Sequence, residues 1–65
     1  MDIDHLGEVI FELTRAGKSM RVTAVHVQTG VEAIIQGPAA YSPQILKKTA
    51  LKKLAYILTK QETEA

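Results

Sequence analysis

The stretch EVIFELTRAGKSMRVTAVHVQTGVEAIIQ, residues 8–36, determines most of the architecture, because apolar and polar side chains alternate along three of its runs. Alternation with a period of two residues is typical of strands that bury one face. We therefore predict strands over 8–14, 20–28 and 31–36. RAGKS, 15–19, and QTG, 28–30, contain the glycines that turns favour, and they predict two antiparallel hairpins.

A helix is the alternative interpretation of the first run. Leu6, Val9, Ile10 and Leu13 also recur with the spacing of one helix face. A strand is favoured by Gly7 and by the run Val9, Ile10 and Phe11, because β-branched and aromatic residues are enriched in strands. The strand is the interpretation that we adopt.

The pattern changes at GPAAYSP, 37–43, where a helix is predicted to begin. Ser42 suits the N-cap and Pro43 the first helical position, and the helix should continue to about Lys60, with QETEA, 61–65, frayed. Apolar residues on one side of this helix predict a stripe that packs on the sheet. The stripe is Leu46, Ala50, Leu51, Leu54, Ala55, Ile57 and Leu58, and its partners are Val9, Phe11, Leu13, Val22, Ala24, Ala33 and Ile35. The predicted fold class is α+β: a three-stranded antiparallel meander followed by one C-terminal helix on one sheet face, β-β-β-α.

Length and composition limit the classes of protein. The chain has 65 residues, which predicts one small domain over 1–65 with an ordered core at about 7–60. It has no cysteine, and no apolar run approaches the about 20 residues that span a bilayer. MDIDHLGEV, 1–9, lacks the pattern of a secretory signal, so we expect a cytoplasmic protein. The net charge of +1 gives no general attraction to nucleic acid or membranes.

One helix cannot cover both faces of a sheet, so the outer face should stay exposed. Its predicted centre is apolar and its rim is charged: the apolar residues are Ile10, Val25, Val27 and Ile34, and the acids are Glu8, Glu12 and Glu32. The turns predict Glu12 opposite Arg21, and Val25 between Glu8 and Ile34. Such a patch favours a protein partner, and a homo-oligomer formed through this face or a sheet edge is the simplest one. The alternative is that β-branched residues merely suit an exposed strand.

LKKTALKKLAYIL, 46–58, carries four lysines and no acid. Lysines on a helix most often form a solvated face. One alternative is weak, sequence-nonspecific nucleic-acid binding, in which contacts to phosphates release counterions and make affinity depend on salt. Another is pairing with acids of a second subunit. The lysines concerned are Lys47, Lys48, Lys52 and Lys53.

Residues suited to catalysis are sparse. His5 and His26 are the only histidines, and His26 falls on the core face near a strand end, which favours a structural role. Ser19 and Ser42 fall in a turn and at a cap, with no base evident nearby. No phosphate-binding, dinucleotide-binding or calcium-binding motif occurs. We expect no enzyme, and no cofactor, metal or small-molecule substrate.

The sequence resembles a family of short alphaproteobacterial proteins of unknown function over about 7–60. The resemblance is carried by GEVIFE, by the TG hairpin and its following strand, by GPA, and by the final L-x-K-L-x-Y-I-L. Members are sometimes labelled serine hydroxymethyltransferase. This chain is too short for a pyridoxal-phosphate fold and has no lysine in a recognisable cofactor setting. The resemblance therefore implies no catalytic or binding residue.

The predicted topology is also similar to the C-terminal part of the double-stranded RNA-binding domain, in which lysines at the start of the last helix contact phosphates. Lys47, Lys48, Ala50 and Lys52 match that pattern in part, but Leu51 stands where a third lysine belongs. The first helix of that domain and its histidine-bearing loop have no counterpart here. DNA-binding modules of three strands and a helix read DNA with the sheet, which the acids on this outer face disfavour. Fold analogy alone does not establish function.

Overall fold

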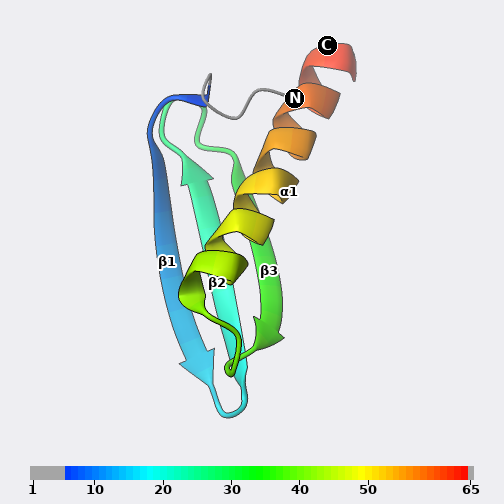
Figure 1. Cartoon of the computed structure of the whole chain (residues 1–65). Helices are drawn as coiled ribbons and strands as arrows, with labels where there is room; N and C mark the ends of the chain where they lie inside the picture. The colour runs from blue at the N-terminus through cyan, green and yellow to red at the C-terminus, as the bar shows by residue number, and fades with distance from the viewer. Residues whose placement is uncertain (1–5, 65) are drawn as a thin grey trace.

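The computed structural model describes the backbone of residues 6–64 and the side chains of residues 6–61. Three strands, β1 (Val9–Ala16), β2 (Ser19–His26) and β3 (Glu32–Pro38), form an antiparallel sheet in the order β1-β2-β3, and one helix, α1 (Pro43–Glu64), follows them (Figure 1). The predicted α+β fold is confirmed. The first run is a strand, so the helical interpretation of it was wrong.

The first hairpin is tighter than predicted. Ala16 pairs with Ser19, which leaves only Gly17 and Lys18 in the turn, and of these two only Gly17 has a positive φ, 61°. A positive φ at the first central residue is the geometry of a type II′ turn, whose twist matches the flanking strands. Glu12 therefore lies opposite Thr23 and not opposite Arg21 as predicted.

The second hairpin is wider than predicted. β2 ends at His26, and the amide of His26 donates to the carbonyl of Val31 at 2.8 Å, so the loop holds residues 27–30. Gly30 has a φ of 78°, and its amide donates to the His26 carbonyl at 2.7 Å. Val25 consequently pairs with Ile10 and Glu32, and the prediction that it lies between Glu8 and Ile34 was wrong. Both errors are slips of two residues, which leave every side chain on its predicted face.

Helix α1 begins where the sequence predicts and ends later. The amide of Ile45 donates to the Ser42 hydroxyl at 3.2 Å, as expected of an N-cap residue. The helix continues to Glu64, four residues beyond the predicted end at Lys60. Residues 61–64, QETE, contain no glycine or proline, and glutamine and glutamate are good helix formers, so nothing in this segment terminates the helix.

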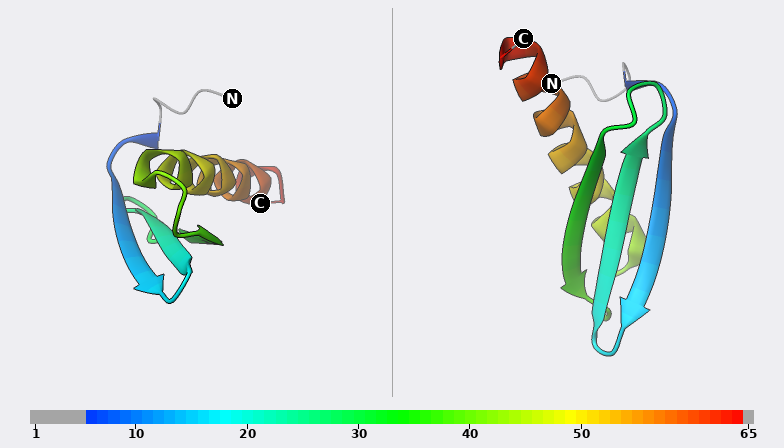
Figure 2. Two further views of the ribbon diagram at one scale, coloured as in Figure 1. Left: turned by 60° about the horizontal axis from the view of Figure 1, so that its bottom comes forward. Right: turned by 180° about the vertical axis from the view of Figure 1, so that it is seen from behind.

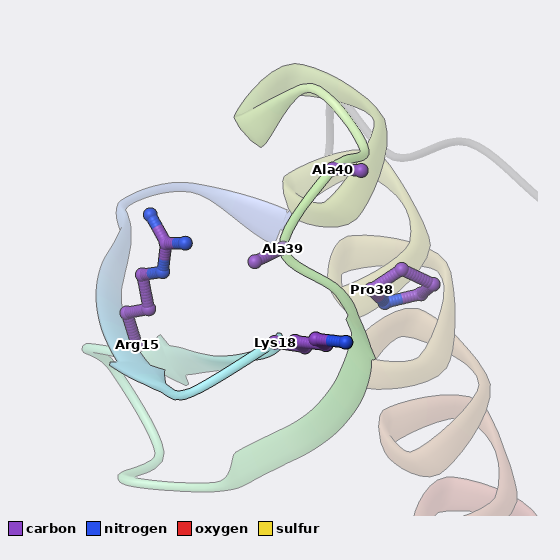
Figure 3. Close-up of a pocket in the computed structure, with 5 residues that line it drawn as sticks. All are labelled: Arg15, Lys18, Pro38, Ala39 and Ala40. Atoms are coloured by element: carbon purple, nitrogen blue, oxygen red, sulfur yellow. The ribbon is translucent and has the colours of Figure 1, made fainter.

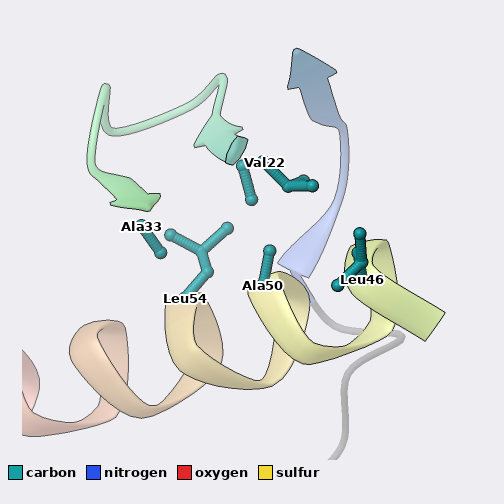
Figure 4. Close-up of a cluster of buried hydrophobic side chains, with 6 residues drawn as sticks. Val22, Ala33, Leu46, Ala50 and Leu54 are labelled. Carbon is teal, nitrogen blue, oxygen red and sulfur yellow. The ribbon is translucent and has the colours of Figure 1, made fainter. Parts of the chain in front are cut away.

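The core lies between α1 and one face of the sheet. The helix crosses that face diagonally and packs mainly on β2 and β3, and the view from behind shows the other face without a helix (Figure 2, right). Side chains from the helix meet those of β2 and β3 in one cluster (Figure 4). Its buried members are Val22, Ala24, Ala33, Leu46, Ala50 and Leu54, and Val9, Phe11, Leu13, Met20, Val31, Ile35, Leu51, Ile57 and Leu58 pack against them.

Gly37 lets the helix approach β3 closely. A Cβ at this position would lie 2.8 Å from Cδ2 of Leu46, nearer than real Cβ contacts allow. Leu46 is only 4% exposed, so its side chain has little room to move. Glycine at the end of β3 therefore allows a separation of helix and sheet at which a larger residue would displace the Leu46 side chain.

Candidate interaction surfaces

The outer face of the sheet carries an exposed apolar patch. We call Ile10, Val25, Val27 and Ile34 the outer-face patch. Ile10 is 55% exposed, Ile34 49% and Val27 48%, while Val25 is half-buried between its neighbours. Ile10 and Val25 lie directly opposite each other on β1 and β2. Val27 follows the end of β2, where its amide donates to the Glu8 carbonyl, so it belongs to the turn and not to the predicted strand.

The rim of this patch is mostly acidic. Glu8, Glu12 and Glu32 are exposed, and Glu32 lies opposite Val25. Arg21 is the basic residue of this face, and it lies opposite Thr14 and Gln36, beyond the patch. Within residues 6–64, no helix or strand lies over this face (Figure 2). The sheet therefore presents an apolar centre with negative charge around it.

Two of the four lysines of the predicted set turn toward the sheet. The Lys47 ammonium lies over the Phe11 ring of β1, 5.8 Å from its centroid, and the Lys53 ammonium donates to the Ile34 carbonyl of β3 at 2.7 Å. Sequence reasoning placed Lys53 on the outward face. Lys53 lies at the border of the apolar stripe of α1. Its long side chain reaches from there to the Ile34 carbonyl of β3.

Lys48 and Lys52 are the lysines of the predicted set that stay on the outward face of α1. Both are exposed and lie one turn apart, so their like charges repel by about 0.2–0.5 kcal/mol. Further along, the Lys60 ammonium lies 6.0 Å from the centre of the Tyr56 ring. The four lysines of the predicted set therefore extend in three directions. Lys48 and Lys52 carry their charge on the face of α1 away from the sheet.

His26 joins the end of β2 to the segment that precedes β1. It is 5% exposed, its Nε2 lies 2.5 Å from the Leu6 carbonyl oxygen, and its Nδ1 lies 2.7 Å from the Thr29 hydroxyl. The carbonyl can only accept, so Nε2 carries a proton and donates. Thr29 also accepts from the Val31 amide at 3.2 Å. Both ring nitrogens are thus used within the fold. His5 lies outside the described residues.

A shallow hollow of about 380 Å³ lies at the opposite end of the sheet, between the first hairpin and the loop that leads to α1. Arg15 and Lys18 line one side, and Pro38, Ala39 and Ala40 line the other (Figure 3). The Nε of Arg15 already donates to the Gly17 carbonyl at 3.1 Å. The lining holds no acid, hydroxyl or imidazole side chain, and its ionisable groups are those of Arg15 and Lys18.

The described part of the chain brings together no three histidine, cysteine, aspartate or glutamate side chains that could hold a metal ion. Among the described residues, no helix combines the length and the apolar character needed to cross a membrane.

Comparison with known proteins gives one match. The family model of a domain of unknown function, DUF6898, matches residues 6–61, which include all three strands and most of α1. This agrees with the resemblance of the sequence to an uncharacterised family. No curated protein and no solved structure matches the chain.

Proposed function

The chain belongs to the DUF6898 family, whose function is unknown, and we propose that it is a non-catalytic interaction module that binds a protein through the outer-face patch. The observation that supports this proposal is the exposure of Ile10, Val27 and Ile34 on one uncovered face. Isolated exposed apolar residues are normal on proteins, whereas a contiguous apolar surface with a polar rim is typical of binding sites. The proposal leaves the cytoplasmic location and the bacterial origin as predictions.

The rim indicates the chemistry of the partner. A second copy packed face to face about a two-fold axis would place two sets of the acids Glu8, Glu12 and Glu32 around one apolar centre. Like charges across an interface oppose association. We therefore infer a partner with an apolar centre and basic residues around it, and we exclude self-association through this face from the proposal.

The patch alone gives limited affinity. Ile10, Val27 and Ile34 are each about half exposed, so covering them contributes roughly 1 kcal/mol apiece, about 3 kcal/mol in total. Association costs at least about 4 kcal/mol in lost freedom of motion. The basic groups of the partner must supply the rest by pairing with the acidic rim. Binding should therefore weaken as salt rises.

Site-specific photo-crosslinking tests this proposal. A photoreactive phenylalanine analogue at Ile34 probes the patch, and the same analogue at Thr49, exposed on the outward face of α1, is the matched control. In the native cell we expect a crosslinked product of discrete mass from position 34, its loss in the Val25→Lys background, and no such product from position 49. Identical products from both positions, or none from position 34, would refute the proposal.

Nucleic-acid binding through α1 is the second candidate. The observation in its favour is that Lys48, Lys52 and Lys60 are exposed on a helix that has no acid between Pro43 and Gln61. Lys47 and Lys53 contact the sheet instead, so we propose at most weak, sequence-nonspecific binding. Fluorescence anisotropy with duplex RNA and DNA at two salt concentrations tests this, with the double variant Lys48→Gln, Lys52→Gln as the control. A wild-type protein that gives no anisotropy change at low salt rules it out.

A further inference from the structure

The two edges of the sheet differ in how their outward main-chain groups are used. On β3, the His26–Val31 hydrogen bond sets the alternation, so Glu32, Ile34, Gln36 and Pro38 direct their main-chain groups away from β2. The Ile34 carbonyl is occupied by the Lys53 ammonium at 2.7 Å, and Pro38 has no amide hydrogen to donate. Lysine and proline are the residues by which natural sheets prevent pairing at an edge.

The β1 edge has no such protection. The hydrogen bond from the Val27 amide to the Glu8 carbonyl sets the alternation here, so Val9, Phe11, Leu13 and Arg15 direct their main-chain groups outward. No group of the described residues 6–61 bonds to them. The strand is eight residues long and contains neither proline nor lysine. Long, apolar, unpaired edges of this kind pair readily with another strand.

The side chains of this edge are also incompletely covered. Helix α1 packs mainly on β2 and β3, so Val9, Phe11 and Leu13 on the helix side of β1 are only half-buried (Figure 2). A strand added at this edge would cover them further. The unpaired main-chain groups and the half-buried side chains of β1 thus both favour the addition of a strand at this edge.

We propose that a second copy of the chain occupies the β1 edge, with the two β1 strands antiparallel about a two-fold axis at Phe11. This inference goes beyond the proposed function, because edge pairing leaves the outer-face patch exposed. In this register Phe11 lies opposite the partner's Phe11, and Val9 lies opposite the partner's Leu13. Three apolar pairs then join the two cores on the helix side, and the aromatic pair adds a favourable ring–ring contact to the burial.

Repulsion between like charges disfavours the registers whose two-fold axis lies at a neighbouring residue. A two-fold axis at Glu12 sets that carboxylate against the partner's Glu12, and an axis at Ile10 sets Glu12 against the partner's Glu8. Like charges directly opposite each other destabilise a strand pair. An axis at Leu13 brings the partner's Arg15 to the Phe11 ring, which the Lys47 ammonium already occupies at 5.8 Å. Of these four neighbouring axes, the one at Phe11 is the one that avoids all three conflicts.

The Lys53 contact and Pro38 prevent pairing at the β3 edge, which explains why the assembly stops at two copies. Pairing through β1 gives a six-stranded sheet whose two ends are both β3. Each end retains the Lys53 contact and Pro38. The β1 edge of each copy is paired in the dimer, so the dimer is a closed assembly.

Single cysteines test the pairing directly, because the natural chain contains none. Opposed residues of a hydrogen-bonded antiparallel pair have Cα atoms about 5.5 Å apart, a separation that suits a disulfide. Under mild oxidation, Phe11→Cys should form covalent dimer at least about 10-fold faster than Glu12→Cys, Leu13→Cys or Gln36→Cys. Faster crosslinking at 12 or 13 than at 11, or equal rates at all four positions, would overturn the proposal.

Proline variants provide a measurement that does not depend on Phe11. Val9 and Glu32 are the first residues of the two edge strands, and both direct their amides away from the sheet, so proline removes no internal hydrogen bond at either site. By sedimentation at roughly 100 µM, a concentration suited to a small interface, we expect wild type and Glu32→Pro as dimers and Val9→Pro with at least 10-fold weaker association. A monomeric wild type, or a dimer that survives Val9→Pro, would overturn the inference. The crosslinks from Ile34 would be unaffected by either result.

Discussion

Leu54→Ala tests whether a single helix closes the core. Leu54 is fully buried and extends from α1 toward β2 and β3 (Figure 4). Removing the three carbons beyond Cβ from such a site costs about 2–5 kcal/mol, and the cost rises with the cavity that remains. The neighbours of Leu54 include Ala24, Ala33 and Ala50, whose short side chains cannot move into the space. We therefore expect a loss of about 3–4 kcal/mol.

This loss is large for so small a protein. At about 0.05–0.15 kcal/mol per residue, 65 residues give a free energy of unfolding of roughly 3–10 kcal/mol. Urea titration followed by circular dichroism measures it, and with a slope of about 1 kcal/mol per molar the midpoint should fall by about 3 M. Tyr56→Ala, at a position of the same helix that is 59% exposed, should lower it by less than about 0.5 M. Equal effects of the two substitutions would show that α1 does not close the core in this way.

Further substitutions test local features, each by urea titration. Gly37→Ala should cost about 1–3 kcal/mol, because its Cβ would lie 2.8 Å from Leu46, and a neutral result would contradict that close approach. Ser42→Ala should cost about 1 kcal/mol through loss of the bond from the Ile45 amide, whereas Ser42→Asp should retain it. Thr29→Val should cost about 1–3 kcal/mol because Nδ1 of buried His26 loses its partner, and an unchanged midpoint would exclude that network.

The order of elements and the two faces of the sheet could be predicted from the sequence because each depends on a period. The alternation along EVIFELT, 8–14, assigns Phe11 to the core and Ile10 to the outer face in whatever register the strand pairs. The register itself depends on the turns. Gly17 allows a two-residue turn, and Thr29 supports a four-residue loop by bonding to both His26 and Val31. Composition alone does not distinguish these turn lengths, so both hairpins were predicted with a slip of two residues.

The lysines of α1 could be assigned to the helix but not to their contacts. Their phase on the helix fixes the direction of each Cβ, whereas a lysine ammonium lies four bonds beyond that atom. Lys47 reaches the Phe11 ring and Lys53 reaches the Ile34 carbonyl, and neither contact has a signature in the sequence. The candidate phosphate-binding set is therefore smaller than the sequence indicated.

The contact between the Lys53 ammonium and the Ile34 carbonyl explains how the helix makes the two edges of the sheet different. One helix on a three-stranded sheet leaves two edges uncovered, and identical open edges would allow chains to add without limit. Lys53 occupies an outward carbonyl at the centre of β3, and none of the residues 6–61 makes an equivalent contact along β1. The position of the helix over β2 and β3 thus produces the asymmetry, because it brings a lysine to one edge and leaves Val9, Phe11 and Leu13 half-buried at the other. A chain of this length can in this way specify one partner strand with a single helix.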